Sequence, residues 1–130
     1  MSMLKKTIGK SGAKVLVVDD EDNFREAAVR VLKDEGYAVL EASDGVEGIE
    51  KAMKELPDII VSDVHMPNMN GFMMVEELEK NEKTSQIPVI MMTGVAQAAG
   101  AWTSNMAVEY LEKPFSLDAL VEAIRKVLKA

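Results

Sequence analysis

The chain has 130 residues, 48% of them hydrophobic and 28% charged, with a formal net charge of −7 at pH 7. This length suits one domain with a sizeable core, and the composition is that of an ordinary globular protein, so disorder is not the default expectation. The acidic balance argues against direct nucleic-acid binding, which normally uses a basic surface. The chain has no cysteine, so disulfides and thiolate metal sites are excluded, which suits a reducing cytoplasm. No apolar stretch approaches the roughly 18 residues needed to cross a bilayer.

The first twelve residues carry three lysines and two glycines with little apolar periodicity. We predict a flexible tail over residues 1–12 and one folded domain over residues 13–130. In chain order, apolar runs predict strands and 3.6-residue spacing predicts helices. The predicted elements are a strand at Lys14–Val18, a helix around Phe24–Leu32, a strand at Tyr37–Ala42, a helix around Val46–Leu56, a strand at Ile59–Val61, a helix around Phe72–Leu78, a strand at Ile87–Met92, a helix around Val95–Met106, a strand at Val108–Leu111 and a helix around Leu117–Leu128.

Residues typical of helix ends support these boundaries. Gly36 and Pro57 are expected to stop the first two helices. Asp44, with Glu47 three residues later, resembles an N-cap pair, and Ser116 is the expected cap of the last helix.

Alternation of strands and helices predicts an α/β fold, a doubly wound five-stranded parallel sheet with five helices. The first, third and fourth strands are continuous apolar runs, as expected for strands buried on both faces. The second and fifth are mixed in polarity and therefore belong at the edges. These patterns together predict the strand order 2-1-3-4-5.

The carboxyl ends of the parallel strands gather chemically active side chains at one edge of the sheet. Asp19, Asp20, Asp63, Thr93 and Lys113 all follow strands in this way. Three crowded carboxylates require a cation, and Mg²⁺ prefers a few carboxylates together with water and phosphate oxygens. An ammonium and a hydroxyl can hold phosphoryl oxygens, and an aspartate can form an acyl phosphate. The sequence therefore predicts a phosphoryl-transfer site in which Asp63 is the nucleophile.

This ordered set of motifs resembles the receiver domain of two-component response regulators, the CheY-like family, over nearly all of residues 13–130. The motifs are Asp19-Asp20, Asp63 with Met66-Pro67 and Gly71, Thr93-Gly94, and Lys113-Pro114-Phe115.

The resemblance implies a role for each acidic residue. Asp63 would accept a phosphoryl group from a phosphohistidine on a sensor histidine kinase or a histidine phosphotransfer protein. Asp20, Asp63 and the backbone carbonyl of His65 would bind Mg²⁺ directly, and Asp19 would act largely through water. His65 would also face the site, where its side chain could tune hydrolysis of the phosphoaspartate.

The resemblance also implies how the signal leaves the site. Thr93 and Lys113 would bind the phosphoryl oxygens, and Tyr110 would couple its rotamer to Thr93. The Lys113–Pro114 peptide bond is a candidate for the cis isomer. The surface made by the fourth helix, fifth strand and fifth helix would switch to control a partner or output domain, in a monomer or a phosphorylation-dependent dimer. Such a protein is a phosphoacceptor switch that catalyses only its own phosphoryl transfer and slow autodephosphorylation.

The chain departs from the family pattern before the fifth strand. The interval from Thr93 to Lys113 is about two residues shorter than expected, and the usual Gly-Ala reads Met106-Ala107. The fourth helix or its flanking loops should therefore be short or irregular. Trp102 falls on the apolar stripe of that helix and is expected to pack in the core.

Other interpretations are available for single residues. Asp19 and Asp20 could cap the first helix, Thr93 could be a turn hydroxyl, Lys113 a surface lysine and Tyr110 a packing residue. At the level of the whole protein, the alternatives are a phosphorylation-independent pseudo-receiver, a flavodoxin-like FMN electron carrier and a haloacid-dehalogenase-like phosphatase. The acids after the first strand would repel an FMN phosphate, and they lack the Asp-x-Asp-x-Thr pattern of the phosphatase.

Overall fold

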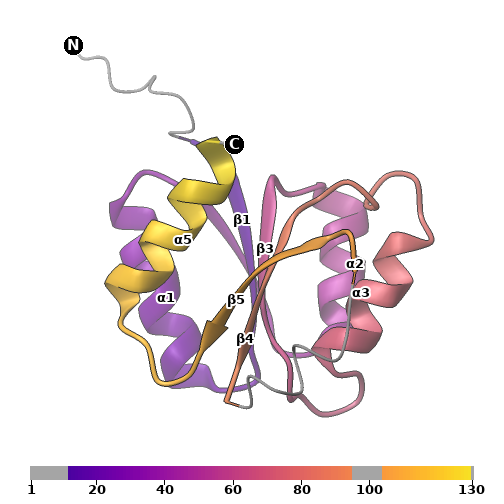
Figure 1. Ribbon diagram of the computed structural model, residues 1–130, viewed down its shortest axis with the longest axis horizontal. Coiled ribbons are helices and arrows are strands. Elements are labelled where there is room, and N and C mark those ends of the chain that lie inside the picture. The colour runs from indigo at the N-terminus through magenta and orange to yellow at the C-terminus, as the bar shows by residue number, and fades with distance from the viewer. Residues whose placement is uncertain (1–11, 95–103, 130) are drawn as a thin grey trace.

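A parallel five-stranded sheet forms the centre of the computed structural model, which describes residues 12–94 and 104–129 (Figure 1). The strand order is β2-β1-β3-β4-β5, which confirms the predicted topology. The strands are β1 (Lys14–Val18), β2 (Ala38–Ala42), β3 (Ile59–Asp63), β4 (Val89–Thr93) and β5 (Ala107–Glu112). All residues of β3 and β4 are buried, whereas β5 alternates between half-buried and exposed positions, as expected for central and edge strands.

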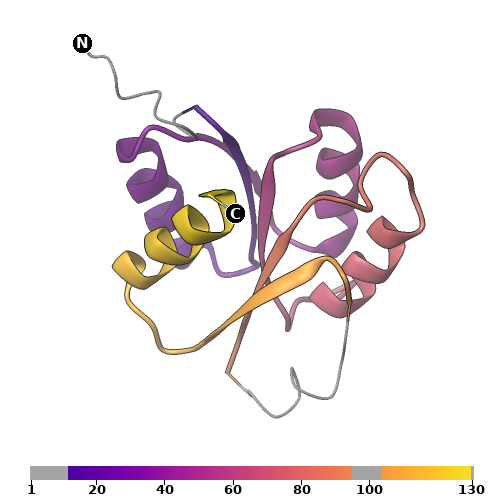
Figure 2. The ribbon, with the colours of Figure 1, turned by 45° about the horizontal axis from the view of Figure 1, so that its top comes forward.

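Two pairs of helices cover the two faces of the sheet. The helices are α1 (Asp22–Asp34), α2 (Gly45–Glu55), α3 (Gly71–Glu79) and α5 (Leu117–Lys129). Figure 2 shows α1 and α5 side by side on one face and α2 and α3 on the other. Alternating residues of the strands fill a separate apolar core on each side, with Val15, Val17 and Val61 facing α1 and α5.

The described residues contain four helices, whereas five were expected. Most of the predicted fourth helix, Trp102 included, lies in residues 95–103, outside the described residues. The end of that prediction was wrong, because Met106 lies in the bend just before β5 and not on a helix. Its side chain is 2% exposed, and its carbonyl accepts the N–H of Val89 at 2.7 Å. Met106 is therefore a core residue that leads the chain into the edge strand.

The predicted helix boundaries are confirmed by backbone geometry and caps. Gly36 follows α1 with a φ of +99°, a conformation that glycine adopts without strain. Asp44 Oδ1 accepts the N–H of Glu47 at 2.9 Å, and the Glu47 carboxylate accepts the N–H of Ser43 at 2.7 Å. Ser116 Oγ accepts the N–H of Ala119 at 3.1 Å. These side chains satisfy donors that the first helical turn leaves unpaired.

The buried face of α2 differs from the predicted one. Val46 and Leu56, placed on the apolar stripe by their spacing, are 45% and 47% exposed. The buried positions are Gly45, Gly48 and Ala52 instead. These small residues let the helix backbone approach β1 closely, because a Cβ atom on Gly48 would lie 3.3 Å from the Val18 side chain. Large apolar residues therefore identified the helix but not the face that packs.

The pairing of β4 with β5 contains one irregularity. Val89 pairs with Ala107 and Ile90 pairs with Glu109, so Val108 is an extra residue in β5. From Ile90 onward the pairing is regular up to Thr93 and Glu112. Among the described residues, none of the helices is long and apolar enough to cross a membrane.

Candidate functional site

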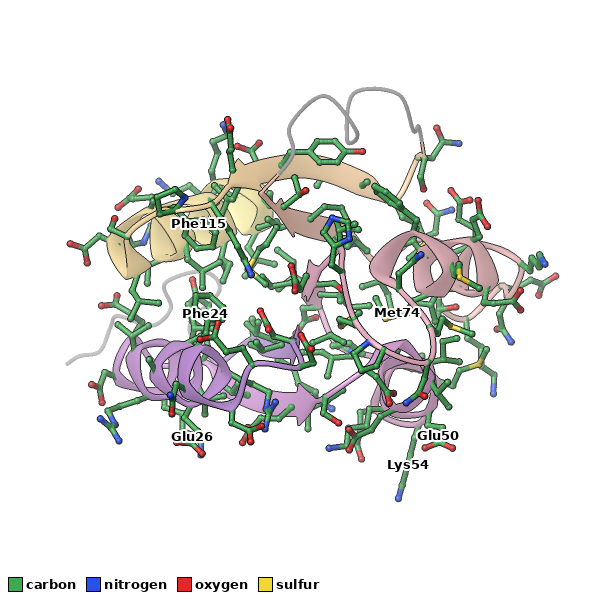
Figure 3. All side chains as sticks on the ribbon, turned by 90° about the horizontal axis from the view of Figure 1, so that it is seen from below. Phe24, Glu26, Glu50, Lys54, Met74 and Phe115 are labelled. Atoms are coloured by element: carbon green, nitrogen blue, oxygen red, sulfur yellow. The ribbon has the colours of Figure 1, made fainter. Side chains whose placement is uncertain are left out.

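The carboxyl ends of four strands meet at one edge of the sheet. Asp19 and Asp20 follow β1, Asp63 ends β3, Thr93 ends β4 and Lys113 follows β5. The strands are parallel, so these ends all lie at the same edge, which faces the viewer in Figure 3. The structure therefore brings together the five residues that the sequence predicted would converge.

Three carboxylates form the floor of this site. One oxygen from each of Asp19, Asp20 and Asp63 lies within 4.8 Å of the others. Asp19 and Asp63 are buried and Asp20 is exposed. Three negative charges this close together repel one another, and a cation bound between them would relieve that repulsion.

Asp19 is held firmly, yet one of its oxygens lacks a hydrogen bond. Its backbone N–H donates to the Ala42 carbonyl at 3.0 Å, and its Oδ1 accepts the N–H of Glu21 at 2.9 Å. Oδ2 is buried and has no hydrogen-bond partner among the described residues. A buried carboxylate oxygen without a partner is costly. Oxygen donors of this kind fit a hard divalent cation such as Mg²⁺, so the residues present suit the metal.

Lys113 places a positive charge beside the acids. Its Nζ lies 3.2 Å from Asp63 Oδ1 and 3.7 Å from Asp19 Oδ2. The backbone N–H of Lys113 donates to the Thr93 carbonyl at 2.8 Å, which links the ends of β5 and β4. The following peptide bond, Lys113–Pro114, is cis, the isomer that the family resemblance led us to expect.

The ring of Phe24 contacts the ammonium of Lys113. The ammonium group lies 5.5 Å from the ring centroid of Phe24, within the range of a cation–π contact. Phe24 and Phe115 point toward one another between α1 and α5 (Figure 3), with ring centroids 5.9 Å apart and an interplanar angle of 90°. Phe115 therefore supports the ring of Phe24, which in turn contacts the ammonium of Lys113.

The two buried acids hold their protons more tightly than exposed ones do. Burial raises the pKa of Asp63, and the nearby charge of Asp20 adds to this, although Lys113 and the Val64 N–H oppose it. Burial likewise raises the pKa of Asp19, and the charge of Asp63 contributes in the same direction. Burial therefore outweighs the nearby Lys113 charge in setting the pKa of both acids.

Comparison with known proteins assigns the chain to a family. Residues 15–125 match the family described as the response regulator receiver domain. The chain belongs to this family. It is 36% identical over 118 residues to protein PilH of Pseudomonas aeruginosa, covering 89% of this chain and 98% of PilH. The protein is thus a two-component response regulator receiver, and phosphoryl acceptance is typical of its family.

Solved structures of other receivers share the fold. Chemotaxis protein CheY4 of Vibrio cholerae is 35% identical, covers 89% of this chain and 98% of its own, and superposes with a TM-score of 0.79. Response regulator TrrA of Thermotoga maritima is 32% identical, covers 88% and 98% of the two chains, and also gives a TM-score of 0.79. That structure is a complex with Mg²⁺-BeF.

The receiver also matches parts of longer proteins. It spans 49% of a DNA-binding transcriptional regulator of Synechocystis and 13% of a sensor kinase of Brucella abortus. Family membership removes the flavodoxin-like carrier and the phosphatase as alternatives for this chain.

Hydrogen bonds connect the loop after β3 to the start of α3 and to the start of α2. Val64 N–H donates to Asp63 Oδ1 at 3.0 Å, and Gly71 N–H donates to the Val64 carbonyl at 2.8 Å. Asn68, with a φ of +69°, donates from its side chain to Asp44 Oδ2 at 2.8 Å. The loop is therefore fastened to the start of α2. The side chain of His65 is exposed within this loop.

Tyr110 lies on β5 opposite Met91, on the edge strand of the receiver. Its side chain is 37% exposed, and burial of part of the ring raises the pKa of its hydroxyl. Thr93 is 1% exposed at the end of β4. Coupling between the two side chains remains a prediction.

Two residues of the receiver site were missed from the sequence, Phe24 and Arg25. Phe24 was assigned only to the apolar stripe of the first helix, yet its ring also contacts the Lys113 ammonium. Arg25 was not singled out, although it donates to the backbone of Asp19. A signal for Arg25 was available, because an arginine in the first turn of a helix opposes the helix dipole and needs acceptors nearby.

The raised pKa values predict how stability depends on pH in the metal-free receiver. The folded state binds protons at Asp19 and Asp63 more tightly than the unfolded state does. Their contribution to the free energy of unfolding is complete below the ordinary carboxyl pKa of 3.8 and is lost as pH rises through the raised values. We expect Asp63→Asn to flatten this decline, as measured by urea denaturation in EDTA at a series of pH values. Parallel curves for the two proteins would contradict the prediction.

Proposed function

We propose that Asp63 accepts a phosphoryl group from a phosphohistidine of a sensor histidine kinase or histidine phosphotransfer protein, in the presence of Mg²⁺. The observation that carries the proposal is the juxtaposition of three carboxylates with Lys113, whose ammonium lies 3.2 Å from Asp63. The reaction joins a carboxylate oxygen of Asp63 to phosphorus and breaks the bond from phosphorus to the histidine nitrogen. With its other ring nitrogen protonated, the histidine leaves as a neutral imidazole, the N–P electron pair returning to the nitrogen that carried phosphorus, and Asp63 becomes an acyl phosphate.

The residues around Asp63 support this role. Asp19, Asp20 and Asp63, with the backbone carbonyl of His65, would hold Mg²⁺. When bound, the metal supplies charge neutralisation for phosphoryl oxygens. Lys113 is near enough to Asp63 to pair with a phosphoryl oxygen attached there. Its contacts with both buried acids keep the ammonium in the site before any phosphoryl group arrives.

Transmission of the signal would use Thr93 and Tyr110. The Thr93 hydroxyl would bind a phosphoryl oxygen, and Tyr110 would change its rotamer in response. The direct backbone hydrogen bond between Thr93 and Lys113 supports this route, because it joins the site to the edge strand that carries Tyr110. The surface of β5 and α5, with the chain that precedes β5, would then bind the effector differently. Slow autodephosphorylation would reset the switch.

The remaining parts of the proposal concern the protein as a whole. The receiver domain would occupy residues 13–130 and act in the cytoplasm. The tail predicted over residues 1–12 lies, apart from Gly12, outside the described residues. The start of β1 at Lys14 and the family match from residue 15 support that boundary. A receiver that only binds partners, without phosphorylation, is the competing interpretation, and phosphorylation itself distinguishes the two.

Metal removal provides the test. Incubation of the protein with acetyl phosphate and Mg²⁺ should add one phosphoryl group, seen as a single mass increase of the intact protein. Excess EDTA should abolish the increase, because the carboxylates would then repel the donor. Acetate plus inorganic phosphate serves as the control and should add nothing. No mass increase with Mg²⁺, or an equal increase in EDTA, would overturn the proposed function.

A further inference from the structure

Arg25 connects three separate parts of the chain beneath the acidic site. It lies in the first turn of α1, and its side chain is only 14% exposed. One terminal nitrogen donates to the backbone carbonyl of Asp19 at 2.7 Å, and the other donates to Asp22 at 2.7 Å. Nε donates to the Glu41 carboxylate on β2 at 3.1 Å. The guanidinium therefore joins the loop after β1, the edge strand β2 and its own helix.

This arrangement depends on properties that only arginine has. Side chains on a helix point back toward its N-terminus, so Arg25 reaches the loop that precedes α1. A planar guanidinium presents its donors in a fixed fork, whereas a lysine ammonium is a single point on a flexible stem. A cation near a helix N-terminus is unfavourable, and here the carboxylates of Asp22 and Glu41 offset that effect.

The hydrogen bond from Arg25 to the Asp19 carbonyl helps to fix the backbone that carries two of the three clustered acids. The backbone of Asp19 donates to Ala42 on one side and accepts from Arg25 on the other. The peptide bond from Asp19 to Asp20 is therefore anchored, and with it the start of both side chains. Both carboxylates belong to the cluster with Asp63.

We propose that Arg25 is a positioning residue that sets the Asp19–Asp20 backbone for cation binding. The proposal rests on the proposed function, because it assumes that the acid cluster binds Mg²⁺. Loss of a residue that orients metal ligands typically weakens metal affinity about 10–100-fold.

The positive charge of Arg25 should weaken Mg²⁺ binding, whereas its positioning of the Asp19 backbone should strengthen it. An experiment can therefore separate the two effects. The guanidinium is positive and sits against the backbone of a proposed ligand, so its charge alone disfavours a cation there. If Arg25 acted only through its charge, its removal would tighten Mg²⁺ binding. If it acts by position, its removal loosens binding, and a lysine that keeps the charge cannot restore the affinity.

The test compares Arg25→Lys and Arg25→Ala in the full chain by calorimetric titration with Mg²⁺. We expect both variants to bind Mg²⁺ about tenfold more weakly than the wild type. Unchanged affinity in Arg25→Lys together with tighter binding in Arg25→Ala would overturn the proposal in favour of charge alone. Unchanged affinity in both variants with a lower free energy of unfolding would overturn it in favour of a merely structural ion pair.

Arg125 offers a matched control on the same face of the sheet. Like Arg25, it makes ion pairs with two carboxylates: Glu35 just after α1 at 2.9 Å, and Glu122 on its own helix α5 at 2.6 Å. Arg125→Lys should leave Mg²⁺ affinity unchanged. A loss equal to that of Arg25→Lys would show that any broken ion pair weakens the site, and would overturn the assignment to Arg25.

A second measurement uses the metal-free protein and so remains informative if the proposed function fails. The N–H of Glu21 donates to Asp19 Oδ1, so its NMR shift reports the position of that carboxylate. We expect Arg25→Lys, but not Arg125→Lys, to shift this resonance and speed its hydrogen exchange. Absence of Mg²⁺ binding by the wild type would contradict the proposed function. An unchanged Glu21 resonance in Arg25→Lys would overturn the positioning role of Arg25 itself.

Discussion

Asp63→Asn is expected to abolish phosphoryl labelling by acetyl phosphate, with a loss of more than about a hundredfold. An amide has no anionic oxygen to attack phosphorus, whereas the Asp63 carboxylate lies at the end of β3 beside the Lys113 ammonium. The variant should remain folded, because the substitution removes a buried carboxyl group whose pKa is raised. Mass spectrometry of the intact protein measures the labelling, and circular dichroism checks the fold.

The other end of the same strand provides the matched control. Asp58 immediately precedes β3 and accepts the backbone N–H of Lys14 at 2.7 Å, at the opposite edge of the sheet. Asp58→Asn removes one carboxylate just as Asp63→Asn does, yet it should label normally. Labelling that persists in Asp63→Asn, or that disappears equally in both variants, would refute Asp63 as the acceptor.

Gly71→Ala is expected to lower the free energy of unfolding by about 2–3 kcal/mol. A Cβ atom there would lie 2.4 Å from the backbone oxygen of Asp63 and 3.2 Å from the Cα atom of Val64. These are backbone atoms, so the clash cannot be relieved by turning a side chain. The start of α3 must move away from the end of β3, which loosens the Gly71 N–H contact with the Val64 carbonyl. Urea denaturation measures the change.

Gly94 is the control for this substitution. Within the described part of the chain, no atom lies within 4 Å of a Cβ built on Gly94, so Gly94→Ala should change stability by less than about 1 kcal/mol. Because the clash in Gly71→Ala involves the Asp63 backbone, phosphorylation of that variant should also slow. A Gly71→Ala protein as stable as Gly94→Ala would mean that the two segments have more room than their geometry indicates.

The sheet and the acid cluster were predictable because both follow from simple patterns. Continuous apolar runs marked β1, β3 and β4 as central, and the parallel topology then placed Asp19, Asp20 and Asp63 at one edge. Once parallel strands are assumed, residues that follow them must meet, however far apart they lie in the chain. No contact between individual side chains was needed for that prediction.

The features that were missed depend on contacts rather than on patterns. The inward face of α2 is made of glycine and alanine, which carry little hydrophobic signal, so Val46 was wrongly placed on the packed side. The role of Arg25 requires knowing that Glu41 on β2 comes near the start of α1. Periodicity identifies elements, but small residues and long polar side chains show their function only after the elements are packed together.

The extra residue in β5, Val108, lies between the chain that enters this strand and the part of the strand that positions Lys113. From Glu109 onward β5 is in step with β4, and the N–H of Lys113 is fixed to the Thr93 carbonyl. The irregularity in the pairing lies at Val108, ahead of that alignment. A shift of the chain before β5 can therefore be accommodated at Val108 while Lys113 keeps its place beside the acids.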